Sequence, residues 1–297
     1  MDKETIRAKI LQTGAVEAGF ARAEPIDPAL ATRLDRWYAD GCHATMEYMP
    51  RHADLRRDPR SLLPSARTVV SAAFPYYPPQ LRDPHLPQIA LYAYGRDYHK
   101  VLVKLLRPVC RFLSEEYGAA TRICVDSAPI AERYWALKCG IGRRGDNGTI
   151  ITDTAGSYIL LAEILTDLEI DPDTPSTEEC SHCGACRRVC PGKAIADDAT
   201  IDARRCLSYL TIEHRDPLSS LQQKILDTPE GRNTLFGCDL CQKICPHNRH
   251  VTATEISALH PDPEFLTLDA EKIAAMTPDA WSAFTAGRPL RRSPRLK

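Results

Sequence analysis

Two runs of closely spaced cysteines are the strongest chemical signal in the sequence. The first, ECSHCGACRRVCPGKA at residues 179–194, contains Cys180, Cys183, Cys186 and Cys190 directly before Pro191. The C-x2-C-x2-C-x3-C-P spacing is that of bacterial ferredoxins, in which three cysteines of a run bind one [4Fe–4S] cluster and the fourth binds another. The spacing therefore predicts iron–sulfur clusters and single-electron transfer.

The second run is incomplete, and one isolated cysteine completes the set of ligands. CDLCQKICPHN supplies Cys238, Cys241 and Cys245, but Leu235 stands where a fourth cysteine would be. Cys206 is the only cysteine between the two runs and is the candidate for the missing ligand. If each run lends its last cysteine to the other cluster, cluster 1 is bound by Cys180, Cys183, Cys186 and Cys245, and cluster 2 by Cys190, Cys206, Cys238 and Cys241.

Two structural zinc sites are the alternative, because zinc sites with four cysteine ligands also use C-x2-C pairs. Zinc ribbons separate two such pairs widely and do not require three cysteines at i, i+3 and i+6 before a C-P step, so iron–sulfur clusters are favoured. The other cysteines lie in helical or strand patterns and are expected to be buried apolar residues. They are Cys42, Cys110, Cys124 and Cys139.

Composition and the N-terminal sequence indicate the cellular context. The chain has 12 cysteines, 43% hydrophobic residues and a net charge of −1. Its start, MDKETIRAKI, has acidic residues and no apolar run, and no segment approaches the roughly 20 apolar residues of a membrane span. We therefore expect a cytoplasmic protein without membrane contact, in which thiols stay reduced. With so small a net charge, contact with a nucleic acid requires a local basic patch.

Alternating helix and strand patterns before the cysteines predict an α/β layer. Helices are expected at 1–19, 29–41, 97–118 (kinked at Pro108) and 129–140, and strands at 67–74, 88–94, 121–126, 149–152 and 157–166. The acidic, proline-containing segment DLEIDPDTPSTEE marks a boundary. We predict an α/β domain at 1–170, a cluster domain at 171–260, and a C-terminal helical extension with a basic tail at 261–297.

Several motifs resemble the epoxyqueuosine reductase family over nearly the whole chain. They are VDSAPIAER (125–133), YAYGRDYHKVL (92–102), the glycine loop GIGRRGDNG (140–148) and both cysteine runs with Cys206, in this order. The resemblance implies an α/β (α+β) cobalamin-binding domain similar to that of reductive dehalogenases, followed by a ferredoxin-like domain with two [4Fe–4S] clusters. This chain differs from many relatives in the glycine loop, where it reads RRGDNG and they have a lysine-asparagine pair.

The resemblance also implies an activity, cofactors and partners. Family members reduce epoxyqueuosine to queuosine at the wobble position of tRNA, the last step of queuosine biosynthesis. They bind cobalamin base-off, without a histidine on cobalt, and DYHKVL indeed lacks the D-x-H-x-x-G signature because Leu102 replaces the glycine. The expected partners are the anticodon stem-loop of tRNA carrying epoxyqueuosine and an external low-potential electron donor such as a ferredoxin or flavodoxin. We expect a monomer.

Asp126 is the predicted catalytic residue. The resemblance implies that it gives a proton to the departing epoxide oxygen, and an acid of this kind at neutral pH needs a raised pKa. A helix N-cap is the alternative role for an aspartate at this position. The resemblance further implies cobalamin contacts at Arg56, Asp126, Arg133, Asn147, Ile150 (through its backbone), Ser208 and Asp239.

Some assignments stay open on the sequence alone. Arg57 could exchange roles with Arg56, and His99 is either structural or part of the substrate entrance. Five of the last ten residues (288–297) are Arg or Lys, which suits either tRNA phosphates or a solvated tail. Longer relatives carry C-terminal helical repeats that contact tRNA, and this chain stops where they would begin. The competing functions are a dehalogenase-like reductase of a small molecule, a paralogue with another substrate, and a simple electron carrier, which would leave residues 1–178 without a role.

Overall fold

A four-stranded antiparallel sheet organises the N-terminal half of the computed structural model, which describes residues 2–293. The strands run in the order β1 (Glu17–Arg22), β2 (Thr68–Pro75), β7 (Ile159–Thr166) and β4 (Thr121–Cys124), and each neighbouring pair is antiparallel. All eight residues of β2 are buried. A strand buried on both faces requires a layer of other elements on each side of the sheet.

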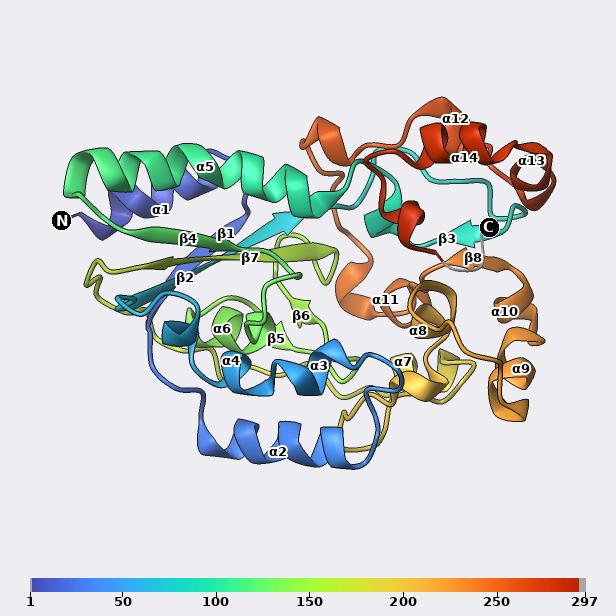
Figure 1. Cartoon of the computed structure of the whole chain (residues 1–297), viewed down its shortest axis with the longest axis horizontal. Helices are drawn as coiled ribbons and strands as arrows, with labels where there is room; N and C mark the ends of the chain where they lie inside the picture. Colours follow the sequence, from blue (N-terminus) through green and yellow to red (C-terminus); the bar gives the residue numbers. More distant parts are fainter. Residues whose placement is uncertain (1, 294–297) are drawn as a thin grey trace.

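Helices supply both layers (Figure 1). α1 (Lys3–Leu11) and α5 (Tyr98–Tyr117) lie on one face, and the residues of α5 that pack there recur every three or four positions, as an amphipathic helix requires. They are Leu102, Leu106, Val109 and Leu113. Pro108 lies inside this helix without ending it.

α6 (Glu132–Lys138) covers the opposite face, where Trp135 and Cys139 join the same core as Val69 and Leu165. Three further helices lie outside it, as Figure 1 shows. They are α2 (Pro28–Ala39), α3 (Tyr48–Arg51) and α4 (Ala53–Arg57). A short hairpin of β5 (Arg143–Arg144) and β6 (Ile150–Ile151) carries the glycine loop.

Two of the predicted elements are wrong in part. The helix expected at 1–19 ends at Leu11, and the chain then enters β1, whose short apolar stretch did not stand out beside the helical pattern. The strand expected at 88–94 is limited to β3 (Gln88–Ile89), and a 3-10 turn follows at Leu91–Ala93.

The cysteine-rich part consists of short helices and loops. Its elements are α7 (Ala185–Val189), α8 (Leu207–Ile212), α9 (Ser220–Leu226), α10 (Pro229–Arg232), β8 (Thr234–Phe236) and α11 (Leu240–Lys243). α7 and α11, one from each cysteine run, pack against each other. β8 pairs in parallel with β3, so a strand from the first half of the chain is built into this part.

The C-terminal segment packs against residues from both earlier parts. It contains α12 (Pro263–Leu266), α13 (Ala270–Ala275), α14 (Pro278–Thr285) and the 3-10 helix η6 (Pro289–Arg292). Phe265 and Leu290 share one core with Tyr94, Tyr158 and Phe236. The division at 170 and 260 stays a prediction, and this core crosses both boundaries. None of the described helices combines the length and apolar character needed to cross a membrane.

Gly156 and Asn248 form a close contact between the sheet region and the end of the second cysteine run. Gly156 has φ +56, and a side-chain carbon there would collide with Asn248 Oδ1. That oxygen accepts a hydrogen bond from the Ser157 backbone N–H at 2.7 Å, and Asn248 Nδ2 donates to Ser157 Oγ at 2.8 Å. These hydrogen bonds of Asn248 therefore connect the cysteine-rich part to the segment that precedes β7.

Candidate functional site

The predicted cluster 1 cysteines gather around one hollow. Cys180, Cys183, Cys186 and Cys245 all line it, together with the glycine loop, and Cys241 also reaches it. Burial raises the pKa of Cys245, and the neighbouring thiols of Cys183 and Cys180 raise it further, which requires the two runs to lie close together. The four thiols expected to bind cluster 1 are therefore neighbours in the fold.

The predicted cluster 2 cysteines form a second group. Burial raises the pKa of Cys206, and Cys190 adds to this effect. Burial raises the pKa of Cys238 to about 12, with Cys206 and Cys190 among the neighbours that raise it. Burial also raises the pKa of Cys241, and the neighbouring thiols of Cys238 and Cys206 raise it further. The isolated Cys206 thus lies beside members of both runs, and the assignment of individual ligands stays a prediction.

The other cysteines lie mainly in the interior. Cys42, Cys124 and Cys139 are buried, as expected, and Cys110 on α5 is half-buried. Cys139 Sγ contacts the backbone carbonyl of Val69 in β2 at 3.5 Å.

Asp126 lies two residues beyond β4, in the loop that leads to α6. Its backbone has φ +46, in the left-handed region that aspartate adopts more readily than most residues. Asp126 Oδ2 accepts hydrogen bonds from Tyr98 Oη at 2.6 Å and from His99 Nε2 at 2.9 Å. Both donors stand at the start of α5, so the N-terminus of that helix positions the carboxylate.

His99 lies between two carboxylates. Its Nδ1 is 2.6 Å from Asp97 Oδ1, and its Nε2 faces Asp126. Ionised carboxylates only accept hydrogen bonds, so both ring nitrogens must carry hydrogen, which makes His99 an imidazolium cation. Burial lowers the pKa of His99, but the hydrogen bonds to Asp126 and Asp97 outweigh burial and raise the pKa above its usual value.

The predicted raised pKa of Asp126 is wrong for this arrangement. Burial tends to raise the pKa, but the hydrogen bonds from His99 and Tyr98 outweigh burial and hold the pKa below its usual value. The N-cap alternative also finds no support, because Ala131 is the N-cap of α6 and no side chain caps that helix. Asp126 is therefore an ionised carboxylate beside a protonated histidine.

Sequence reasoning missed four residues around Asp126. Asp97 and Tyr98 stand beside His99 in the YAYGRDYHKVL motif, but the motif assigned a role to neither of them. Glu132 Oε1 accepts the backbone N–H of Asp126 at 2.5 Å, and Glu163 lies fully buried behind it on β7. The signal for Glu132 was its place in VDSAPIAER; nothing in the sequence around Glu163 distinguishes it.

Arg56 and Arg57 make different contacts. Arg57 forms ion pairs with Asp35 and Asp54. Arg56 Nη1 donates to the backbone carbonyl of Met49 at 2.9 Å and influences the phenol of Tyr48, which also faces Asp126. Arg57 is thus held by two carboxylates, whereas the charge of Arg56 acts on a tyrosine on which Asp126 also acts.

Three predicted cobalamin contacts lie on α6 and the glycine loop. Arg133 is exposed, and a side chain at Gly148 would contact its Nη1. Asn147 Oδ1 accepts a hydrogen bond from the Thr149 hydroxyl at 2.8 Å, and Asn147 also hydrogen-bonds Cys241. Ile150 is buried in β6, so a ligand contact there would use its backbone, as expected. The glycine loop therefore connects the sheet region to the cysteine runs.

Ser208 and Asp239 lie beside the cluster cysteines. The backbone N–H of Ser208 hydrogen-bonds the Cys206 thiol. Asp239 Oδ2 accepts the Leu91 backbone N–H at 2.7 Å, and burial raises the pKa of Asp239 to about 6. The geometry gives Asp239 a structural role that joins the second run to the turn after β3; its contact with cobalamin stays a prediction.

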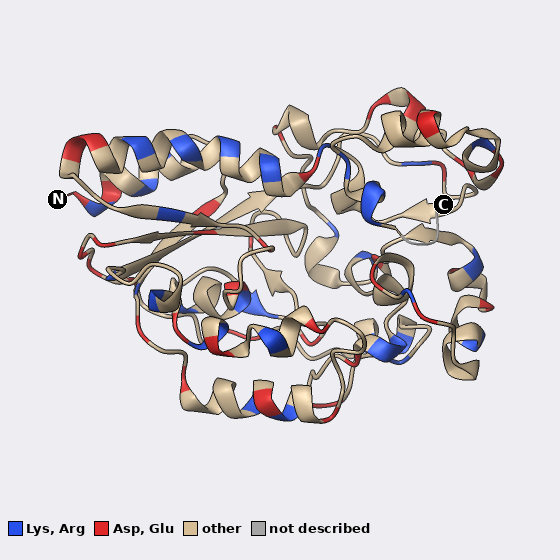
Figure 2. Ribbon diagram, viewed as in Figure 1, with Lys and Arg blue, Asp and Glu red and all other residues tan. Residues whose placement is uncertain are grey.

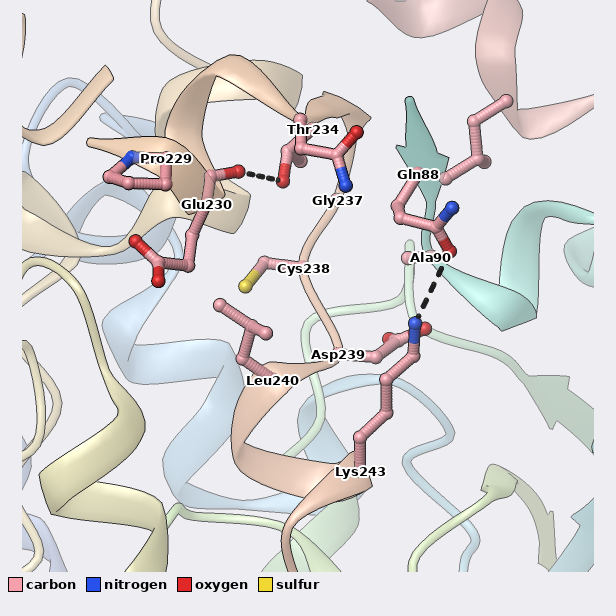
Figure 3. Close-up of a pocket in the computed structure, with 12 residues that line it drawn as sticks. Gln88, Ala90, Pro229, Glu230, Thr234, Gly237, Cys238, Asp239, Leu240 and Lys243 are labelled. Carbon is pink, nitrogen blue, oxygen red and sulfur yellow. Dashed lines mark hydrogen bonds between the residues drawn. The ribbon is translucent and has the colours of Figure 1, made fainter. Parts of the chain in front are cut away.

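A cavity of about 250 Å³ opens beside Cys238 and Asp239 (Figure 3). Lys243 reaches across it, with Nζ 3.5 Å from Gln88 Oε1. Asp239 is the only predicted cobalamin residue among those that line it. This cavity therefore does not bring the predicted cofactor residues together.

The residues that face Asp126 come from distant segments of the chain. Burial raises the pKa of Tyr48 to about 12, and the charges of Glu213, Asp126, Arg56 and Arg292 also act on it. Burial likewise raises the pKa of Tyr92, and the charges of Asp126, Arg292 and Glu213 also act on this phenol. α3, α4, the start of α5, the end of α8 and η6 thus carry residues that interact electrostatically with Asp126 or with Tyr48 and Tyr92, and we call these residues the Asp126 region.

Comparisons with known proteins agree with these observations. Residues 56–127, from Arg56 to just past Asp126, match the family model of epoxyqueuosine reductase QueG, DUF1730. The chain is 34% identical to the epoxyqueuosine reductase of Cellulophaga algicola, over 94% of this chain and 89% of that protein. It is 41% identical to that of Cyclobacterium marinum, over 88% of this chain and 80% of that protein.

The chain belongs to the epoxyqueuosine reductase family. Among solved structures, the epoxyqueuosine reductase of Streptococcus thermophilus matches with a TM-score of 0.84 at 27% identity, over 99% of this chain and 78% of that one. An epoxyqueuosine reductase solved with an epoxyqueuosine-modified tRNA-Tyr stem loop matches with a TM-score of 0.82 at 27% identity, over 96% and 76% of the two chains.

Two further matches bear on the expected fold of this epoxyqueuosine reductase family member. Residues 179–248 match the 4Fe-4S double cluster binding domain, which confirms two iron–sulfur clusters in place of zinc. A catabolic reductive dehalogenase matches with a TM-score of 0.52 at 18% identity, over 95% of this chain and 35% of that one. The fold predicted from the resemblance, an α/β (α+β) domain like that of the dehalogenases followed by a double-cluster domain, is confirmed.

Proposed function

We propose that this protein reduces epoxyqueuosine to queuosine in tRNA, with cobalamin and two [4Fe–4S] clusters. The observation that carries the proposal is the similarity to epoxyqueuosine reductases over most of the chain, which includes the segment from Arg56 to Asp126. Removing the epoxide oxygen as water consumes two electrons and two protons. The protein must therefore bring an electron supply and a proton supply to one place.

The cysteine set fits the two clusters, since eight thiolates in two spatial groups match two four-thiolate sites. Base-off cobalamin fits the Asp126 region, because His99, the histidine of the RDYH stretch, is already engaged by Asp97 and Asp126 and is not free to bind cobalt. Arg56, Arg133, Asn147, Ser208 and the backbone of Ile150 are the residues that would hold the cofactor. Cobalamin, when bound, supplies a strongly reducing cobalt centre.

The proton supply is assigned to Asp126 and His99 together. Asp126 is ionised at rest, so it becomes an acid by taking a proton from the His99 imidazolium, 2.9 Å away. Asp97, on the other ring nitrogen, stabilises the cation and fixes the orientation of the ring. Tyr98 donates to the same carboxylate oxygen and limits its rotation. General acid catalysis of this kind contributes roughly 10²–10⁴-fold to a rate.

The electrons are assigned to an external low-potential donor such as a ferredoxin or flavodoxin. Cys183 is exposed, whereas the other predicted ligands are more enclosed. Cluster 1, which Cys183 is predicted to bind, is therefore placed to receive electrons from such a donor and to pass them to cluster 2. The protein is expected to act as a monomer in the cytoplasm.

The RNA contact is assigned to the C-terminal end of the described chain. Figure 2 shows basic residues on η6, where Arg291 and Arg292 are exposed. The positive charge of Arg292 lowers the pKa of both Asp126 and His99, so this arginine interacts electrostatically with the Asp126 region. It is held there by its backbone, since Arg215 Nη2 donates to the Arg292 carbonyl at 3.3 Å. Arg295 and Lys297 of the predicted basic tail lie outside the described residues.

The test is reconstitution under anaerobic conditions. Purified protein with cobalamin and a low-potential reductant should convert epoxyqueuosine-containing tRNA to queuosine-containing tRNA, detected by the loss of one oxygen from the nucleoside mass. Asp126→Asn protein with the same iron and cobalamin content is the control. Conversion of a halogenated small molecule but not of the tRNA would favour the dehalogenase-like alternative and overturn the proposal.

A further inference from the structure

Two carboxyl side chains lie behind the Asp126 loop, in positions that the reaction as described does not use. Glu163 on β7 is fully buried, and its Oε1 accepts a hydrogen bond from Ser71 Oγ at 3.2 Å. Its other oxygen, Oε2, is buried without a hydrogen-bond partner among the described residues. Glu132, in the first turn of α6, accepts a hydrogen bond from the loop and its charge acts on Glu163.

Glu132 makes the contact that fixes the backbone of Asp126. Its Oε1 accepts the Asp126 N–H at 2.5 Å, where the chain has φ +46. The left-handed conformation is strained for a residue other than glycine, and it persists only where its surroundings hold it. The side chain of Asp126 is about half exposed, at 51%, so packing alone does not hold it.

Burial favours the neutral form of both glutamates. Glu163 is fully buried, and burial raises its pKa well above the usual value even though Ser71 Oγ donates a hydrogen bond to it. Burial, and then the negative charge of Asp126, raise the pKa of Glu132 to about 8. Arg133 and His99 are the positive groups that act on Glu132. The groups near Glu163 are Glu132 and the thiols of Cys124 and Cys139, and burial raises the pKa of both thiols.

The hydrogen bond from the Asp126 N–H favours the ionised form of Glu132, whereas burial and the Asp126 carboxylate favour the neutral form. The carbonyl oxygen of a neutral carboxyl group accepts an N–H, and it adds no negative charge next to the Asp126 carboxylate. An ionised Glu132 would repel that carboxylate at short range. We propose that Glu132, backed by the buried Glu163, is a positioning residue whose Oε1 holds the backbone of Asp126 in the left-handed conformation required for proton transfer.

The catalytic consequence rests on the proposed function, whereas the structural hold does not. Displacing a catalytic group by about 1 Å can lower a rate about 10²-fold. Glu132→Ala should therefore lower kcat at least about tenfold, with KM for the tRNA stem-loop nearly unchanged. Glu132→Gln keeps the accepting oxygen and the neutral charge, and should restore most of the lost kcat. If Glu132→Gln is as impaired as Glu132→Ala, the accepting oxygen at position 132 does not position Asp126 and the proposal is wrong.

Amide hydrogen exchange tests the hold without any substrate. Peptides that span residues 125–131 should exchange faster in Glu132→Ala than in the wild type at pH 7, and Glu132→Gln should remain protected. Unchanged exchange in Glu132→Ala would overturn the proposal whatever the substrate is. Faster exchange in a protein whose wild type does not reduce epoxyqueuosine in tRNA would instead refute the proposed function and leave the positioning role intact.

Discussion

Nε2 of His99 lies 2.9 Å from Oδ2 of Asp126, while the other ring nitrogen of His99 faces Asp97. This arrangement divides the task of an acid between two residues. Asp126 is exposed enough to reach a ligand, and His99, only 12% exposed, holds the proton. A lone aspartate would need a raised pKa to act as an acid at neutral pH, and the neighbouring imidazolium removes that requirement.

Asp126→Asn is expected to bind both clusters and cobalamin but to lose turnover. Asparagine tolerates the left-handed backbone as well as aspartate does, so the loop should keep its shape. It cannot relay a proton, and the rate of epoxyqueuosine reduction should fall at least about a hundredfold. Single-turnover assays with tRNA, alongside iron and cobalamin determination, check this. Near-normal reduction by the variant would mean that Asp126 is not the acid.

His99→Gln is expected to weaken the protein most between about pH 5 and 6.5. The pKa of His99 is raised, so its contribution to stability is complete below the unfolded value of about 6.5 and is lost as the pH rises through the folded value. The pKa of Asp126 is lowered, so its contribution is present above about 3.9 and is lost as the pH falls through the folded value.

The difference in Tm between wild type and His99→Gln should therefore shrink as the pH is raised from 6 to 9, measured anaerobically by thermal unfolding. His85→Gln, at an exposed loop position, is the matched control and should show no such trend. A Tm difference that stays constant or grows toward alkaline pH would contradict an imidazolium at position 99.

Cys206→Ser is expected to remove one cluster and spare the other. Cys206 lies beside Cys190 and Cys238, which are assigned to cluster 2. Iron content should fall from about eight to about four atoms per chain, with the broad absorption near ~400 nm reduced by about half. Cys110→Ser, on α5, should keep the full iron content. Unchanged iron in Cys206→Ser would show that the ligand assignment is wrong.

Arg292→Gln is expected to weaken tRNA binding without loss of iron or cobalamin. If its guanidinium contacts a phosphate, the dependence of log K on log salt should decrease by about one unit of slope. Arg107→Gln, an exposed arginine on α5, removes the same charge from another part of the surface and serves as the control. Equal effects of the two substitutions would indicate general electrostatics and no specific contact.

The sequence predicted the chemistry of the cysteines far better than the setting of Asp126. Cluster ligation depends on local spacing, and Cys206 could be found because no other cysteine separates the runs. Glu132 and Glu163 could not be paired from the sequence, because β7 and α6 meet only through the tertiary fold. The lowered pKa of Asp126 depends on α5 approaching the end of β4, which no local pattern reveals. β1 was missed for a similar reason, since only its pairing with β2 makes EAGFAR a strand.

The contact between Gly156 and Asn248 is expected to restrict which residues can occupy these two positions in the family. The glycine has no room for a side chain because the asparagine amide fills the space, and that amide in turn holds the chain at Ser157. A change at either position alone would leave a collision or an unfilled gap between the sheet region and the second cysteine run. These two positions, far apart in the sequence, are therefore expected to vary together among homologues.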